Sequence, residues 1–201
     1  MSELNTSLKP FIDLIQFTNS QNAVASYSIL ASHGRFDVLD NQNITTVSKK
    51  ILTDYLRKSL GYRGITVSDA MWMGEYGHLT TDKLVVIYLK SLLAGMDLQM
   101  ISGKTFAPTV KFFCDIYDDT LSNNDKTSLT LELGLEWNEL RQKFIERLTE
   151  STERIENVKR TLVHAHKIQS VERFIDPKDS TTELRNEYYL GLDKLGLQIH
   201  E

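Results

Sequence analysis

The chain has 201 residues and a mass of 23.0 kDa, a size that predicts one domain. Its 23 basic and 27 acidic residues are interspersed and give a net charge of −4, so nucleic acid is not expected as a partner. The longest apolar runs are too short to span a bilayer, so no membrane partner is expected either. The single cysteine, Cys114, excludes an intramolecular disulfide, and the first residues are polar and unlike a signal peptide. We therefore expect a cytoplasmic protein.

In chain order, helical and strand-like periodicities alternate along the first half of the sequence. The pattern predicts a short helix at 9–18, a buried strand at 24–31, a helix at 47–60, a strand at 65–68, a helix at 82–93 and a strand at 97–101. Thr46 is a suitable N-cap for the second of these helices. Alternation of this kind predicts an α/β fold in which the three strands are parallel and adjacent, with right-handed crossovers and the helices 47–60 and 82–93 on one face.

The second half of the sequence is predicted to be helical. The expected helices are 108–122, 125–148 with a break near Gly134, and 150–168. The polar tail from 170 to 201 is interpreted as an extension with a helix at about 181–195.

Three polar side chains follow the three predicted strands. His33 comes after the first strand, Asp69 after the second and Ser102 after the third. Ligands bind at the carboxyl ends of parallel strands in α/β folds, so these residues mark the candidate site. Asp69 is the best placed for chemistry, as a nucleophile, a general base or a metal ligand. The alternative is that Asp69 caps the turn that follows it.

The residues after Asp69 are large and apolar, namely Met71, Trp72 and Met73. They suit either the packing of a loop against the core or the wall of a site for a ring-shaped ligand. His33 is likewise either a ligand contact or a loop histidine bonded to backbone. His164 and His166 are two residues apart and point to different faces of a helix, which does not suit a shared metal. Metal-binding motifs and a glycine-rich phosphate loop are absent from the sequence, so no metal and no cofactor are expected.

From about residue 10 to 169 an ordered series of segments resembles glycoside hydrolase family 3, most of all its bacterial β-N-acetylhexosaminidase branch. The segments are "SHGRFDVLD" (32–40), "TVSKKILTDYLRKSLGYRGITVSDAMWMG" (46–74), "LLAGMDLQMI" (92–101) and "RLTESTERIENVKRTL" (147–162). In the family they resemble the loop after the sixth strand, the helix and seventh strand that ends in Ser-Asp, the eighth strand, and the helix that closes the barrel.

This resemblance implies a partial TIM barrel, made of about the last three strand–helix units with C-terminal helices. Residues 1–169 would be the C-terminal part of the (β/α)₈ barrel, and residues 170–201 a helical extension. Asp69 matches the family's catalytic nucleophile, which attacks the anomeric carbon in retaining hydrolysis of β-linked N-acetylglucosamine glycosides. His33, Trp72 and Met73 are the expected substrate-binding residues.

The resemblance also identifies missing parts. The first five strand–helix units of the barrel are absent from this sequence, and the loop that carries the family's His–Asp acid/base pair is absent with them. We therefore expect the isolated chain to be inactive. One hypothesis is an enzyme fragment that works with a separate N-terminal barrel fragment. The other is a truncated, non-catalytic carbohydrate-binding or assembly module, or a remnant, that self-associates or binds a partner.

Overall fold

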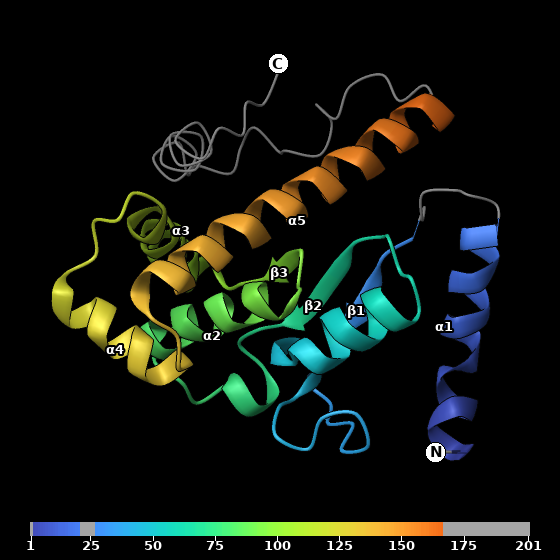
Figure 1. Ribbon diagram of the computed structural model, residues 1–201, viewed down its shortest axis with the longest axis horizontal. Helices are drawn as coiled ribbons and strands as arrows, with labels where there is room; N and C mark the ends of the chain where they lie inside the picture. Colours follow the sequence, from blue (N-terminus) through green and yellow to red (C-terminus); the bar gives the residue numbers. More distant parts are fainter. Residues whose placement is uncertain (1, 21–26, 167–201) are drawn as a thin grey trace.

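The computed structural model describes residues 2–20 and 27–166 of the chain (Figure 1). Its elements are, in order, α1 (Ser2–Ser20), β1 (Ile29–Ala31), η1 (Thr45–Val47), η2 (Lys50–Ser59), β2 (Thr66–Ala70), η3 (Gly74–Tyr76), α2 (Thr81–Ala94), β3 (Leu98–Met100), α3 (Gly103–Tyr117), α4 (Asn123–Leu133) and α5 (Trp137–His166). The predicted helix at 181–195 and the boundary between 169 and 170 lie outside the described residues.

The three strands form one parallel sheet in the order β1-β2-β3, as predicted. Ile29 is paired with Thr66, and Val67 is paired with Leu98, with an irregularity in register between Val67 and Ala70. The mixture of helices with a parallel sheet makes this an α/β fold. The predicted strand at 24–31 is shorter than expected within the described residues, since β1 begins at Ile29. The second strand instead runs further, so Asp69 is its penultimate residue and does not follow it.

The helix expected at 47–60 begins later and is wound differently. A short 3₁₀ turn, η1, comes first, and η2 contains wide turns, such as the bond of 2.9 Å from the Leu60 N–H to the Tyr55 carbonyl. Thr46 is not its N-cap, so that prediction was wrong. The hydroxyl of Ser48 accepts the Ile51 N–H at 3.1 Å instead, because Thr46 is used elsewhere.

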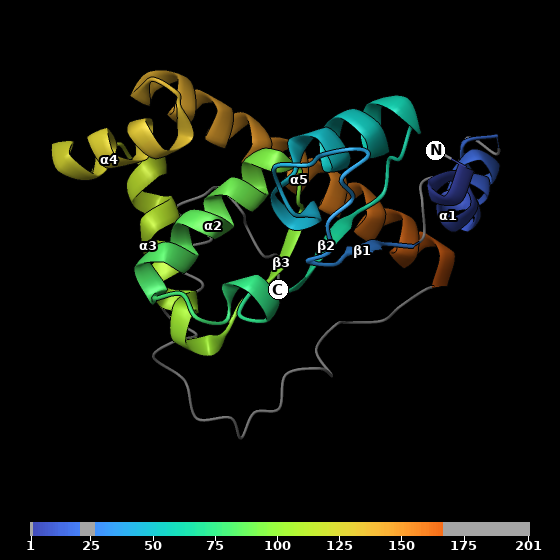
Figure 2. The ribbon, with the colours of Figure 1, turned by 90° about the horizontal axis from the view of Figure 1, so that it is seen from below.

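The helices η2 and α2 lie on the same side of the sheet (Figure 2). Buried Leu52 of η2 and Ala94 of α2 pack with Ala31 of β1 and with Met96. The larger core cluster joins α2 to α3, α4 and α5 around the fully buried Leu89, Leu140 and Phe144. Burial of these apolar side chains is the main force that holds the helices on the sheet.

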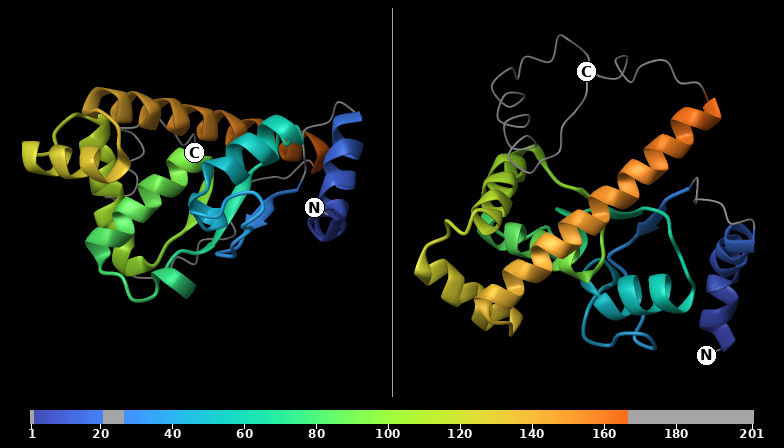
Figure 3. Two further views of the ribbon diagram at one scale, coloured as in Figure 1. Left: turned by 60° about the horizontal axis from the view of Figure 1, so that its bottom comes forward. Right: turned by 45° about the horizontal axis from the view of Figure 1, so that its top comes forward.

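The last helix differs most from prediction. The break near Gly134 is present, where Gly134 has φ 65°, but the second break expected near residue 149 is not. Instead α5 is a single helix of 30 residues that runs across α2 and past the sheet toward the side of the molecule where α1 lies (Figures 1 and 3).

The opposite face of the sheet is apolar and open. Leu30, Val67 and Leu98 are in register, one from each strand, and form a row across it. Leu30 is 58% exposed and Leu98 is 42% exposed. Side chains alternate between faces along a strand, so this row points away from the helices that cover Ala31 and Thr66. We call it the open face.

At the amino end of β3 the buried carboxylate of Asp97 joins the sheet to two helices. Its side chain has no exposed surface, and it forms ion pairs with Arg57 of η2 and with Arg147 and Arg154 of α5. The Thr66 N–H of β2 also donates to it, at 3.0 Å. Burial lowers the pKa of the Arg57 guanidinium, and the charge of Asp97 opposes that effect. We refer to Asp97 and its three arginines as the Asp97 cluster.

The Asp97 cluster generates a prediction about stability. Replacing Asp97 by Asn keeps the shape and removes the charge, which leaves the mostly buried Arg57 guanidinium without its counter-ion, while Arg147 and Arg154 keep Glu150. Removing one partner of a buried ion pair typically costs about 3–5 kcal/mol, so Asp97→Asn is expected to lower the free energy of unfolding in urea by that order. Asp13→Asn is the control, since Asp13 and its partner Lys9 are mostly exposed, and its cost should stay below about 1 kcal/mol. Equal losses in the two variants would contradict the role of the cluster.

Candidate active site

Asp69 lies near the carboxyl end of the central strand, on the open face. The side chains before and after it, Ser68 and Ala70, are buried on the other face, and Asp69 itself is half-buried. One carboxylate oxygen accepts the Ala70 N–H at 2.7 Å. Within residues 2–20 and 27–166, Asp69 forms no salt bridge. A carboxylate that is fixed on a strand and lacks a cation partner remains available to a ligand.

The three residues of the apolar cluster after Asp69 are divided between two roles. Met71 is fully buried and packs with Ile44, Tyr76 and Tyr88, so for this residue the packing interpretation holds. Trp72 is 41% exposed and Met73 is 53% exposed. Two adjacent large apolar groups that remain exposed beside a carboxylate suit the wall of a ligand site.

His33 connects the loop after β1 to the end of β2. Its Nε2 lies 2.9 Å from the Ala70 carbonyl oxygen, and its Nδ1 lies 3.0 Å from the hydroxyl of Thr46. The ring also packs edge-on against Tyr76, with 4.9 Å between ring centres. Both ring nitrogens are used within the protein, as the interpretation of a loop histidine bonded to backbone requires.

These bonds define which ring nitrogen of neutral His33 carries the proton. The Ala70 carbonyl can only accept, so Nε2 must donate and Nδ1 must accept from the Thr46 hydroxyl. Thr46 in turn lies 3.2 Å from the Tyr76 hydroxyl, which is its donor in this arrangement. Burial raises the pKa of Tyr76, so its proton is retained for that bond. The hydrogen bonds therefore run from the Tyr76 hydroxyl to Thr46, from Thr46 to His33, and from His33 to the carbonyl of Ala70, the residue after Asp69.

Ser102 follows β3 at the same edge of the sheet as His33 and Asp69, because all three strands are parallel. Its hydroxyl lies 3.0 Å from the Thr105 hydroxyl at the start of α3, and it is half-buried. The three predicted polar residues thus lie at one edge of the sheet. Asp69 is the only one of the three with a carboxylate, and its side chain lies on the open face.

Sequence reasoning missed a charged pair at this edge. Arg35, in the loop after β1, donates from both Nε and a terminal nitrogen to the carboxylate of Glu75, each at 3.3 Å. Both side chains are about half exposed. The two residues are 40 positions apart and no periodicity connects them, so only the fold shows that they meet.

The loop after β1 is held by a second buried carboxylate, Asp40. Its oxygens accept the Gln42 N–H at 3.1 Å, the Asn43 amide at 3.0 Å and the Ser48 hydroxyl at 2.7 Å. Burial raises the pKa of Asp40, but these bonds and nearby Lys50 outweigh that effect and lower it from 3.8 to about 2. Asp40 therefore remains ionised and fixes the loop that carries His33.

In the part of the chain that the structure describes, no group of three or more His, Cys, Asp or Glu side chains is arranged to hold a metal ion. None of the helices among residues 2–20 and 27–166 is long and apolar enough to cross a membrane.

The fold and site define an α/β protein whose candidate chemistry lies at the carboxyl edge of a parallel sheet. The family model described as "Glycosyl hydrolase family 3 N terminal domain" matches residues 5–125, which is more than half of the chain. The chain belongs to this family. The match includes all three strands and Asp69, while the resemblance of residues 147–162 lies beyond it. A search of curated proteins found no match.

Asp40 makes the stability of the chain dependent on pH. A carboxyl whose pKa is lowered by folding stabilises the protein above its unfolded pKa, and that contribution is lost as the pH falls through the folded pKa. The loss should therefore occur between about pH 4 and pH 2 and amount to about 2 kcal/mol. Asp40→Asn should remove this component of urea-unfolding curves measured across that range. Asp13→Asn, an exposed control, should leave it unchanged; an unaltered pH dependence in Asp40→Asn would contradict the assignment.

His33→Leu tests whether the hydrogen bonds of His33 stabilise the folded protein. The change removes the acceptor of the Thr46 hydroxyl proton and one of the two donors to the Ala70 carbonyl. Thr46 keeps its contact with the Tyr76 hydroxyl, and Ala70 keeps the Met73 N–H, so the loss is that of two hydrogen bonds, each worth about 0.5–1.5 kcal/mol. We expect thermal or urea unfolding to show a loss of at least about 1 kcal/mol. His78→Leu, at an exposed histidine, should change stability by less than about 0.5 kcal/mol. Equal stability of the two variants would leave no structural role for His33.

Proposed function

We propose that this chain is the C-terminal part of a retaining glycosidase barrel that acts on β-linked N-acetylglucosamine glycosides, with Asp69 as nucleophile. The observation that carries the proposal is the position of Asp69 in a member of glycosyl hydrolase family 3. It lies on the open face at the carboxyl edge, without a salt bridge among the described residues.

In this mechanism the Asp69 carboxylate attacks the anomeric carbon and forms a covalent ester while the glycosidic oxygen leaves. Water then hydrolyses the ester. Trp72 and Met73 provide an exposed apolar surface for the sugar ring. His33 has no free ring nitrogen for a sugar hydroxyl, so we assign it to holding the end of β2 in place.

The proposal includes a partner. The leaving oxygen needs a proton, and proton transfer by a positioned group is worth about 10²–10⁴ in rate. The resemblance places that acid/base pair in strand–helix units that this sequence lacks. The open face and the two sheet edges support a partial TIM barrel that a separate N-terminal fragment completes.

A second candidate function is a truncated, non-catalytic module that binds carbohydrate or assembles with itself. The row of exposed Leu30, half-buried Val67 and exposed Leu98 favours it, because exposed apolar surfaces mark interaction sites. An upstream reading frame that codes for the five missing units would favour the enzyme.

Activity measurements separate the two candidates. The purified chain should hydrolyse an aryl β-N-acetylglucosaminide very slowly or not at all. Addition of a polypeptide with the first five strand–helix units should raise the rate, and Asp69→Asn should abolish that gain because an amide cannot form the glycosyl ester. Asp82→Asn, an exposed aspartate at the start of α2, is the control and should keep the gain. A complemented rate that Asp69→Asn leaves unchanged would place the nucleophile elsewhere.

A further inference from the structure

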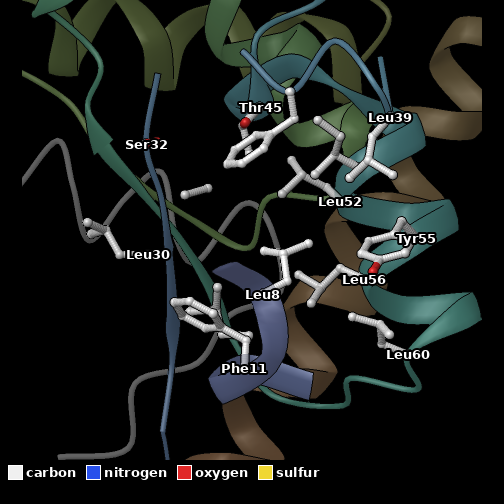
Figure 4. Close-up of a pocket in the computed structure, with 14 residues that line it drawn as sticks. Leu8, Phe11, Leu30, Ser32, Leu39, Thr45, Leu52, Tyr55, Leu56 and Leu60 are labelled. Atoms are coloured by element: carbon white, nitrogen blue, oxygen red, sulfur yellow. The ribbon is translucent and has the colours of Figure 1, made fainter. Parts of the chain in front are cut away.

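An apolar cavity of about 230 Å³ lies beside the free edge of β1, between α1 and η2 (Figure 4). Leu8 and Phe11 reach it from α1, and Leu52 and Leu56 reach it from η2 (Figure 4). An apolar cavity of ~150 Å³ already holds a benzene molecule, so this one has room for aliphatic side chains.

The strand next to the cavity has one unpaired edge. β1 pairs only with β2 among the described strands, and the Ile29 N–H donates to Ile65 on that side at 3.0 Å. Backbone groups alternate in direction along a parallel strand, so the N–H and C=O of Leu30 point to the other edge. Such an edge accepts an added strand, whose alternate side chains then enter the neighbouring pocket.

The chain itself contains a segment with the required pattern. Residues 195–199 read Leu-Gly-Leu-Gln-Ile, with large apolar side chains at Leu195, Leu197 and Ile199 and small or polar residues between them. This strict alternation is the pattern of a strand with one buried face. The apolar set suits the cavity, while Gly196 and Gln198 would lie on the side of the open face, next to Leu30.

The connection is long enough. The described part of α5 ends at His166, on the side of the molecule where α1 lies (Figures 1 and 3). The 28 residues from 167 to 194 span up to roughly 90 Å when extended, so reach does not limit the contact.

We propose that residues 195–199 add a fourth strand to the free edge of β1 and place Leu195, Leu197 and Ile199 in the cavity between α1 and η2. The interaction is intramolecular and does not depend on the proposed glycosidase function. It covers one of the two edges of the sheet, and a covered edge cannot pair with the edge of another molecule.

Hydrogen exchange of the Leu30 amide in the full-length chain tests the proposal. The added strand should protect this amide, and Leu197→Asp should raise its exchange rate at least about tenfold, because a charge cannot enter the apolar cavity. Gln198→Asp is the matched control, one residue away on the opposite face, and should keep the protection. Equal exchange in all three chains would overturn the proposal.

Cross-linking identifies the occupant. In a Cys114→Ser background, Phe11→Cys combined with Leu197→Cys should form an intramolecular disulfide readily, and Phe11→Cys combined with Gln198→Cys should form it much more slowly. A disulfide-linked dimer whose yield rises with protein concentration would assign the cavity to a second copy and overturn the proposal. Absence of any disulfide, together with an unprotected Leu30 amide, would overturn it as well.

Discussion

The arrangement of the whole molecule depends on one buried carboxylate, Asp97. It stands at the amino end of β3 and accepts bonds from β2, η2 and α5 at once. Charges are expensive to bury, and three guanidinium groups near one another would repel without it. The position of α5 across the sheet is therefore coupled to the register of β2 against β3. A hydrophobic core alone would hold these elements together, but it would not fix how they are aligned.

Two carboxylates mark opposite ends of the same sheet and have opposite environments. Asp97, at the amino end, is fully buried and surrounded by cations, so it can do no chemistry with a ligand. Asp69, at the carboxyl end, is half-buried and has no salt bridge within the described residues. This division follows a general rule of parallel α/β folds, where one end supplies stability and the other supplies the site. The sequence "Ala-Gly-x-Asp" of residues 94–97 thus belongs to the structural end.

The alternating periodicities were sufficient to predict the three strands, their parallel order and most helices. They were not sufficient to predict where elements begin and end. Thr46, for example, has a side chain suited to an N-cap, but in the fold its hydroxyl is hydrogen-bonded to His33 and Tyr76. The position of Asp69 at the carboxyl end of the central strand could be predicted from its place at the end of a buried run, although it lies within the strand and does not follow it. The roles of Asp97 and Asp40 could not, since their partners are up to 57 residues away or lie in an irregular loop. Contacts between distant polar residues leave no periodic signal in a sequence.

Both proposals, the completing barrel fragment and the added strand of residues 195–199, involve the free edge of β1. A polypeptide that completes a barrel must pair with this edge and cover the open face, since the row of Leu30, Val67 and Leu98 faces the interior of any such barrel. The strand proposed for residues 195–199 would use the same backbone groups of Leu30. One edge accepts one strand, so the two arrangements exclude each other. A partner that pairs with this edge would then have to displace the segment, and its apparent affinity would be its intrinsic affinity multiplied by the fraction of chains in which the edge is free. The C-terminal residues would in that way oppose the proposed assembly with an N-terminal barrel fragment, while protecting the isolated chain from aggregation.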